Sequence, residues 1–276
     1  MNAEARWTPT ATEDGSWTLF DAAVGEACHS LAGAWTQARE RYAAQIDELA
    51  AERPGAIPGR RVRLLDVGTG LGLNLAAALE RCEARGLVLE ATRLELHLGA
   101  PRAALSFARE QGSASASHAR VLGALERWLV AEVEAGGIPA PGPVTVELPG
   151  EGGTIHRIEF VAGDARLTLP ALAPERRFDL VVLDPFSPRA DPALWEGEFL
   201  AEIARRMEPF ARLSTYSSSM RVRTRLAAAG LAVGAGPRVG RKAEGTLASR
   251  GGAVPPLAGR TARRLERATR GLGPQK

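Results

Sequence analysis

Asp184 is the residue whose position in this sequence points most directly to chemistry. It follows residues 180–183, all of them apolar, and it precedes Pro185 and Phe186. An apolar run of this kind predicts a strand buried on both faces of a parallel sheet, and the proline ends that strand. A carboxylate there lies where open α/β sheets bind ligands. The alternative is an acid that caps a helix or a turn.

A glycine-rich loop is the second signature. Gly68, Gly70 and Gly72 follow Asp66 at the end of a predicted strand and precede Asn74 at the start of a predicted helix. Alternating glycines let a ligand approach the backbone, and the helix N-terminus offers free N–H groups. A dinucleotide loop has the spacing Gly-x-Gly-x-x-Gly, whereas Gly-x-Gly-x-Gly after an acidic strand end resembles the S-adenosylmethionine loop of class I methyltransferases. A purely structural glycine turn is the alternative.

Two more acids are predicted at strand ends. Glu95 lies roughly 20 residues beyond the loop, where doubly wound folds place an acid that binds ribose hydroxyls, and Glu90 is a nearby competitor. Asp164 follows the third strand, where class I methyltransferases commonly hold the adenine amino group; a turn-capping Asp is the alternative. The residues predicted to bind the cofactor, S-adenosylmethionine, are therefore Asp66, Gly68, Gly70, Gly72, Asn74, Glu95 and Asp164.

The elements that must position these residues alternate between strand and helix. We expect strands at residues 61–67, 87–96, 144–148, 154–161, 178–183, 210–216, 231–235 and 245–249. Helices are expected at residues 75–85, 101–111, 119–134, 191–207 and 220–229, with Asp191 as the N-cap of the fourth. This order predicts an α/β, Rossmann-like fold. The resemblance of the glycine loop implies that the fold is that of a class I S-adenosylmethionine-dependent methyltransferase.

The chain divides into three predicted parts. Residues 1–59 form an N-terminal lobe, a hairpin turning at Asp14-Gly15 and a helix over residues 31–52, which packs on the catalytic domain. Residues 60–250 form the methyltransferase domain. Residues 251–276 are basic and poor in apolar side chains, which predicts a disordered tail.

Composition excludes several classes of protein. Two cysteines and four scattered histidines lack ligand-like spacing, so we expect no metal site. The absence of a long apolar run and of a signal pattern predicts a cytoplasmic protein with no membrane contact. The net charge of +3 is concentrated in residues 251–276, which leaves residues 1–250 near −2. RNA binding therefore cannot rest on the bulk charge of the body.

The separated blocks, in this order, resemble the stand-alone MnmC-type tRNA methyltransferases over roughly residues 12–250. The blocks that carry the resemblance are residues 12–16 (Thr-Glu-Asp-Gly-Ser), His29-Ser30, Gly33-Ala34, Asp184 to Pro188 with Trp195, Thr215-Tyr216-Ser217, Val222-Arg223 and Gly240-Arg241-Lys242 with Glu244. The sequence departs from the family pattern at Cys28, Gln37 and Ala243, where Tyr, Glu and Arg are usual, and no basic residue follows Glu95 closely.

The resemblance implies an activity. It implies S-adenosylmethionine-dependent methylation of the primary amine of 5-aminomethyl-(2-thio)uridine at the tRNA wobble position, without the flavin-dependent oxidase domain of the family. Asp184, with Pro185 and Phe186, is then the catalytic group. The implied substrate-binding residues are His29, Ser30, Tyr216, Arg241 and Lys242.

Several interpretations stay open. Together with Arg241 and Lys242, three further arginines form either a phosphate-binding rim for the anticodon stem-loop or a solvated face: Arg221, Arg223 and Arg238. Thr215 and Ser217 either contact ligands or cap the next helix, and His29 is either a pocket residue or a satisfied turn histidine. The alternative functions are a methyltransferase of small amines and a catalytically silent fold that binds tRNA or protein.

Overall fold

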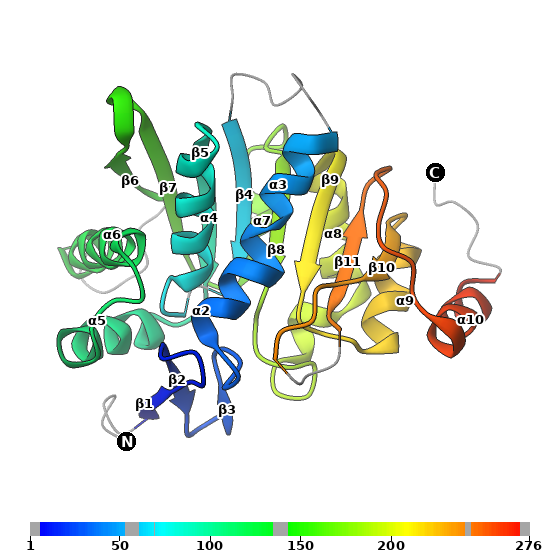
Figure 1. Ribbon diagram of the computed structural model, residues 1–276, viewed down its shortest axis with the longest axis horizontal. Helices are drawn as coiled ribbons and strands as arrows, with labels where there is room; N and C mark the ends of the chain where they lie inside the picture. The colour runs from blue at the N-terminus through cyan, green and yellow to red at the C-terminus, as the bar shows by residue number, and fades with distance from the viewer. Residues whose placement is uncertain (1–5, 53–60, 69, 135–142, 241–243, 271–276) are drawn as a thin grey trace.

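Strand β4 (Arg61–Val67) lies in the middle of the main sheet, between β8 (Phe178–Leu183) and β5 (Val88–Glu95). The computed structural model describes residues 6–52, 61–68, 70–134, 143–240 and 244–270 (Figure 1). Within them the strand order of this sheet is β10-β11-β9-β8-β4-β5-β7-β6. Successive strands extend the sheet in opposite directions from β4, so the β4–β8 boundary is the switch point at which open α/β sheets bind ligands.

The remaining strands extend the sheet on both sides. Parallel pairing continues to β7 (Ile155–Ala162) on one side and to β9 (Met207–Thr215) on the other. Three strands are antiparallel to their neighbours: β6 (Val144–Pro149), β10 (Ala232–Ala235) and β11 (Thr246–Ser249). The last two strands pair with each other. Because β11 also pairs with β9, the edge strands of this sheet are β10 and β6.

Helices cover both faces of the sheet (Figure 1). Leu64 packs in one core cluster with α4 (Leu73–Ala84) and α6 (Ala116–Glu134), and α5 (Gly99–Gln111) lies beside α6. The next residue, Leu65, packs in a second cluster with α7 (Ala165–Ala171), α8 (Gly197–Arg206) and α9 (Met220–Ala228). This alternation of side chains is why continuously apolar strands are needed in a sheet covered on both sides.

A small antiparallel sheet lies at the carboxyl ends of the main strands. It consists of β1 (Trp7–Ala11), β2 (Trp17–Asp21) and β3 (Glu26–Ala27), and the predicted hairpin is confirmed. Trp7, Trp17 and Leu19 pack against the start of α4 and against α5. The N-terminal lobe therefore covers the sheet edge at which ligands are expected.

The predicted N-terminal helix is present but irregular. Its regular ends are α2 (Ala34–Thr36) and α3 (Gln45–Glu52), and η1 (Gln37–Ala43) between them is π-helical. A π-turn shifts the helix face by one residue, so that residues five apart lie over one another. Gln37 and Tyr42 have this spacing.

Two regions differ from the sequence prediction. The helix predicted over residues 191–207 is divided into a 3-10 turn, η4 (Pro192–Trp195), and α8, and the Asp191 side chain caps neither. The tail predicted to be disordered contains helix α10 (Gly259–Thr269), which lies against α9; Leu265 is half-buried, whereas the arginines of the helix are exposed. None of the helices in the described part of the chain has the length and hydropathy that a membrane span requires.

Candidate active site

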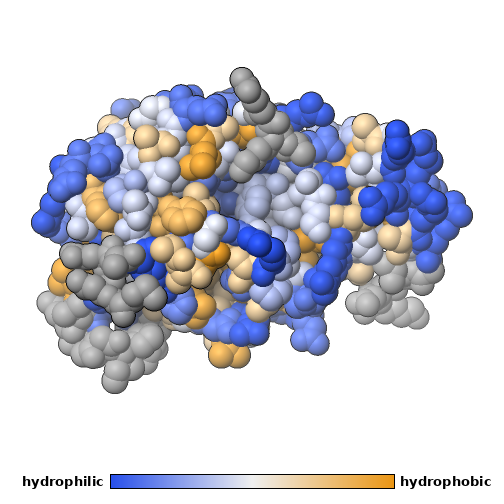
Figure 2. Space-filling model, turned by 90° about the horizontal axis from the view of Figure 1, so that it is seen from below, coloured by the Kyte–Doolittle hydropathy of each residue, from blue (hydrophilic) through white to orange (hydrophobic). Residues whose placement is uncertain are grey.

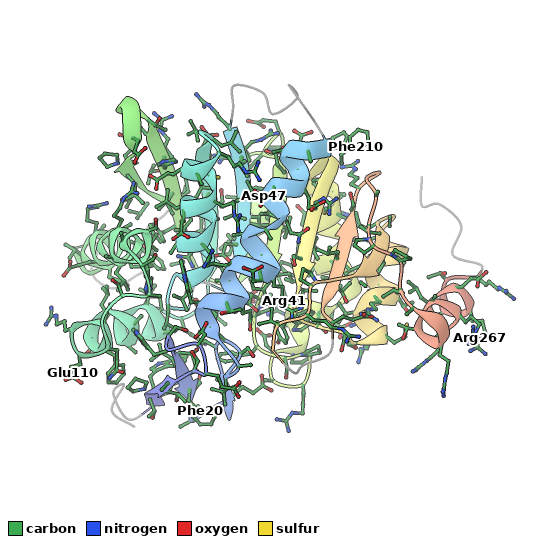
Figure 3. All side chains as sticks on the ribbon, viewed as in Figure 1. Phe20, Arg41, Asp47, Glu110, Phe210 and Arg267 are labelled. Carbon is green, nitrogen blue, oxygen red and sulfur yellow. The ribbon has the colours of Figure 1, made fainter. Side chains whose placement is uncertain are left out.

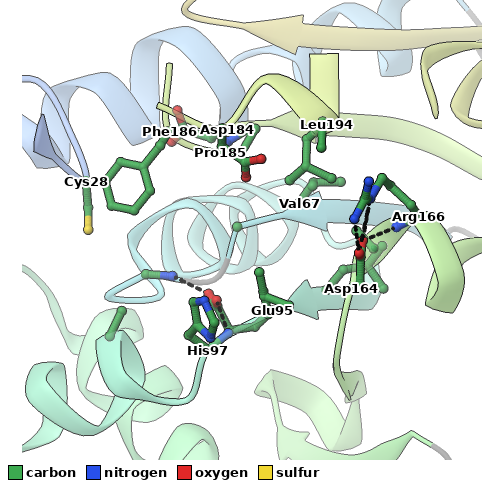
Figure 4. Close-up of a pocket in the computed structure, with 18 of the residues that line it drawn as sticks. Cys28, Val67, Glu95, His97, Asp164, Arg166, Asp184, Pro185, Phe186 and Leu194 are labelled. Atoms are coloured by element: carbon green, nitrogen blue, oxygen red, sulfur yellow. Dashed lines mark hydrogen bonds and ion pairs between the residues drawn. The ribbon is translucent and has the colours of Figure 1, made fainter. Parts of the chain in front are cut away.

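A cavity opens at the carboxyl ends of β4, β5 and β8 (Figure 4). Its polar lining includes Glu95, the last residue of β5, and Asp164 after β7, and Phe186 lies across from Glu95. Apolar side chains complete the walls: Val67, Leu94, Leu96, Ala165 and Leu194. We call it the cofactor cavity. The predicted meeting of three strand ends is thus present in the structure.

The three loop glycines have different roles. Gly68 lines the cofactor cavity at φ +95°, and a Cβ there would lie 3.0 Å from the backbone oxygen of Asp184. Gly70 also lines the cavity, at φ +47°. Gly72 does not, because it begins α4 at φ +79°, where a Cβ would lie 2.7 Å from the Val121 side chain of α6. Gly72 therefore packs against α6, and its contact with the cofactor stays a prediction.

Asp66 and Asn74, which are also predicted to bind the cofactor, do not belong to the lining of the cavity. The Asp66 carboxylate is fully buried, 2.9 Å from the guanidinium of Arg93. The Asn74 amide donates a hydrogen bond of 2.9 Å to Asp184 Oδ2. Neither lines the cavity, so each acts through another residue: Asp66 through the strand end that bears the loop, and Asn74 through Asp184.

Glu95 and Asp164 both line the cavity. The Glu95 carboxylate accepts from the backbone N–H of His97 at 3.0 Å, whereas Glu90 lies outside the cavity and pairs with Arg61 at 2.6 Å. The Asp164 carboxylate accepts from the Arg166 N–H and forms an ion pair with its guanidinium, so its contacts are those of the helix-capping alternative.

Asp184 lies between the cofactor cavity and a second cavity. The second cavity, here called the acceptor cavity, is lined by His29, Ser30 and Tyr216 among others, and Asp184, Pro185 and Phe186 belong to both. Thus all the described residues predicted for catalysis and substrate binding meet in one place.

The Asp184 carboxylate is held at both oxygens. Tyr42 donates to Oδ1 at 2.6 Å, Asn74 donates to Oδ2, and the Gln37 amide lies 3.4 Å from Oδ1. Asp184 is only 8% exposed, and this burial raises its pKa to about 7 against the opposing effect of the two short hydrogen bonds. A carboxyl group that titrates near neutral pH in a cleft has the properties of a general base.

Sequence reasoning missed Tyr42. It lies in the predicted helix and looks like an ordinary core residue, and its hydroxyl reaches Asp184 because η1 is π-helical. The signal that was available is weak: Tyr42 is one of only two tyrosines in the chain, and the other, Tyr216, bonds the carbonyl of the neighbouring Pro185.

The loop after Asp184 is fixed by three hydrogen-bonding partners. Tyr216 donates to the Pro185 carbonyl at 2.9 Å, and the Trp195 indole donates to the Phe186 carbonyl at 2.9 Å. Glu26 of β3 accepts from the N–H of Ser187 at 3.0 Å and from its hydroxyl. Tyr216 therefore engages the carbonyl of Pro185, one of the residues predicted to be catalytic.

The remaining predicted residues fall into separate groups. His29 is buried and bonded to Thr18, and burial lowers its pKa to about 3, so its ring is neutral. Arg223 is buried against Thr246 and Gly245, so it is not part of a phosphate rim. The Ser217 hydroxyl accepts from Ser219 N–H, and the Ser217 carbonyl accepts from the Thr246 hydroxyl at 2.6 Å. Arg241 and Lys242 lie outside the described residues. Within those residues, no group of three potential ligand side chains is placed to hold a metal ion.

The comparisons with known proteins agree with this geometry. A family model of S-adenosyl-L-methionine-dependent methyltransferases matches residues 142–251. The solved structure of MnmC2 from Aquifex aeolicus is 30% identical and matches with a TM-score of 0.71, covering 94% of this chain and 75% of that one. The chain belongs to the MnmC methyltransferase family. Its fold is accordingly that of class I methyltransferases, and its cofactor is S-adenosylmethionine.

Curated relatives in the MnmC family are longer. They include the tRNA 5-methylaminomethyl-2-thiouridine biosynthesis bifunctional proteins of Ralstonia nicotianae and Caulobacter vibrioides. The first is 30% identical over 250 residues, which is 88% of this chain and 34% of the relative. The second is 32% identical over 223 residues, 76% and 32% of the two chains. This chain therefore spans about a third of the length of these relatives.

Proposed function

We propose that this protein transfers a methyl group from S-adenosylmethionine to the primary amine of 5-aminomethyl-(2-thio)uridine at the wobble position of tRNA. The observation that carries the proposal is the position of Asp184, whose carboxylate is shared by the cofactor cavity and the acceptor cavity. A group in this position can act on an acceptor atom held beside the cofactor.

The cofactor cavity fits S-adenosylmethionine. Gly68 leaves no side chain between its backbone and Asp184, the Glu95 carboxylate can accept from ribose hydroxyls, and the apolar walls suit an adenine ring. Gly70 and Asp164 complete the proposed contacts. When bound, the cofactor supplies an electrophilic methyl group on a positively charged sulfur.

Asp184 prepares the acceptor. A primary alkylamine is mostly protonated at neutral pH and must lose a proton before its lone pair can attack. The Asp184 carboxylate, with a pKa of about 7, accepts that proton at an oxygen. Tyr42 and Asn74 fix the plane of the carboxylate, while Phe186 and Pro185 form a wall that excludes water.

The tRNA partner is supported by two independent features. The MnmC relatives carry tRNA modification in their names. In addition, α10 presents Arg260, Arg263, Arg264 and Arg267 at helical spacing on its exposed side, and Figure 2 shows hydrophilic residues gathered at this end of the molecule. Arginines on one helix face are suited to phosphate contacts. We propose that Arg241 and Lys242 also contact the tRNA. The part of the tRNA that is bound is the anticodon stem-loop.

A labelling experiment tests the proposal. Tritiated S-adenosylmethionine is incubated with the protein and bulk tRNA from a strain blocked at the aminomethyl stage, and the digested nucleosides are separated. We expect the label in the methylaminomethyl wobble nucleoside. Label in a pool of small amines with none in RNA would instead indicate a small-amine methyltransferase. Tight cofactor binding with no label in either pool would indicate a silent fold.

A further inference from the structure

Arg41 is a buried cation in the wall of the acceptor cavity (Figure 3). It is 3% exposed, and its Nε and Nη1 atoms have no hydrogen-bond partner among the described residues. The Arg41 backbone is fixed, because Ser214 Oγ donates to the Arg41 carbonyl at 2.9 Å. Nε and Nη1, however, are removed from water without receiving acceptors from the described part of the chain in return.

Another buried arginine shows what a structural role requires. Arg206, 6% exposed, donates to Glu202 and to the backbone oxygens of residues 170, 172 and 173. No ion pair of this kind is formed by Arg41 with any described residue. Its charge therefore contributes little to holding the fold together.

The surroundings of Arg41 nevertheless make room for it. Gly245 leaves space for the guanidinium group, because a Cβ at this position would lie only 1.9 Å from Arg41 Nη1. The neighbouring residue Tyr42 bonds Asp184, and the positive charge of Arg41 favours the ionised form of that carboxylate. The guanidinium is thus kept beside the reactive acid, in the cavity proposed for the acceptor.

We propose that Arg41 binds the acceptor nucleotide, donating hydrogen bonds to an oxygen atom of that nucleotide. The inference rests on the proposed function and names the recognition group within it. The two oxygen acceptors we consider are the carbonyl at C4 of the uracil ring and a phosphate. The C4 carbonyl adjoins the carbon that bears the aminomethyl group, so an arginine bonded to it would hold the amine next to Asp184. A guanidinium group donates well to either oxygen.

Arg41→Met and Arg41→Gln test this assignment, with Arg206→Met as the control. Each variant is characterised by its thermal midpoint without ligands, its Kd for S-adenosylmethionine, and its KM and kcat on aminomethyl-stage tRNA. For the Arg41 variants we expect a tRNA KM raised about tenfold or more, an unchanged cofactor Kd, and a midpoint equal to or above that of the wild type. Arg206→Met should lower the midpoint and leave the tRNA KM unchanged in the folded fraction.

The outcomes separate this inference from the proposed function. If wild-type protein does not label tRNA, the proposed function fails irrespective of Arg41. If it does, an unchanged KM in both Arg41 variants overturns the inference, and so does loss of folding in both, because that would show a structural role. The binding of 5-aminomethyluridine as nucleoside and as 5′-monophosphate then identifies the oxygen. A tenfold loss in the variants with both compounds indicates the base carbonyl, and a loss with the monophosphate alone indicates the phosphate.

Discussion

The phenol of Tyr42 donates a hydrogen bond of 2.6 Å to the Asp184 carboxylate, which lies 142 residues further along the chain. The bond joins the N-terminal lobe to the end of β8 inside the protein, with Tyr42 fully buried. The lobe is therefore part of the machinery of the site, because it supplies the group that orients and tunes the acid. Glu26 strengthens the same connection through Ser187.

Tyr42→Phe should shift the pH dependence of methyl transfer. The Tyr42 hydrogen bond lowers the pKa of Asp184 against the effect of burial, so its loss should raise that pKa from about 7 by about one unit. The acidic limb of the plot of kcat/KM against pH is then displaced to higher pH by the same amount. Tyr216→Phe is the matched control, because its hydroxyl bonds the Pro185 carbonyl and not the carboxylate. Equal shifts in the two variants would contradict this role for Tyr42.

The raised pKa of Asp184 also predicts how stability varies with pH. Because the folded state holds this proton more tightly than the unfolded state, the contribution is favourable at low pH and is lost as pH rises through about 7. Asp184→Asn has no such dependence. Its free energy of unfolding relative to wild type should therefore increase by roughly 2–3 kcal/mol between pH 5 and pH 8.5.

Denaturant unfolding at several pH values measures this difference. Asp164→Asn is the control: the ion pair with Arg166 lowers the pKa of Asp164, so that carboxylate stays ionised throughout the same range. A constant difference between Asp184→Asn and wild type would show that Asp184 does not titrate near neutral pH.

Glu95→Ala should weaken the binding of S-adenosylmethionine by about tenfold or more, since it removes a charged acceptor from the cofactor cavity. Glu90→Ala removes the same side chain from the same strand outside the cavity, where it pairs with Arg61, and should leave the cofactor Kd unchanged. Calorimetric titration of both variants checks the assignment. A larger loss of cofactor affinity in the Glu90 variant would show that Glu90, and not Glu95, binds the cofactor.

Charge reversal on α10 should weaken tRNA binding without affecting the cofactor. We expect Arg263→Glu with Arg264→Glu to raise the tRNA KM and to reduce its dependence on salt, by about one unit of slope for each phosphate that the variant no longer binds. Arg102→Glu with Arg109→Glu makes the same charge change on exposed positions of α5, at the opposite end of the molecule (Figure 1). If the two pairs of substitutions weaken tRNA binding equally, α10 has no specific role in tRNA binding.

The sequence predicted the elements and the strand-end acids because both depend on short-range patterns. Apolar runs, turn residues and glycine spacing place Asp184, Glu95 and Asp164 at one edge of a parallel sheet without knowledge of long-range contacts. Gly72 shows the limit of such patterns, since its proximity to Val121 of α6 decides its role. The π-turn that aims Tyr42, and the unpaired state of Arg41, depend on contacts between segments far apart in the chain, which no local pattern encodes.

Asp184→Asn tests the proposed mechanism most directly. The substitution keeps the size of the side chain and removes its ability to accept a proton from the acceptor amine. In single-turnover assays on aminomethyl-stage tRNA at pH 8, we expect transfer of the tritiated methyl group to be abolished, while the Kd for S-adenosylmethionine stays within a few-fold of wild type. Transfer at the wild-type rate, or a parallel loss of cofactor binding, would contradict the role of Asp184 as the acid that orients and deprotonates the amine.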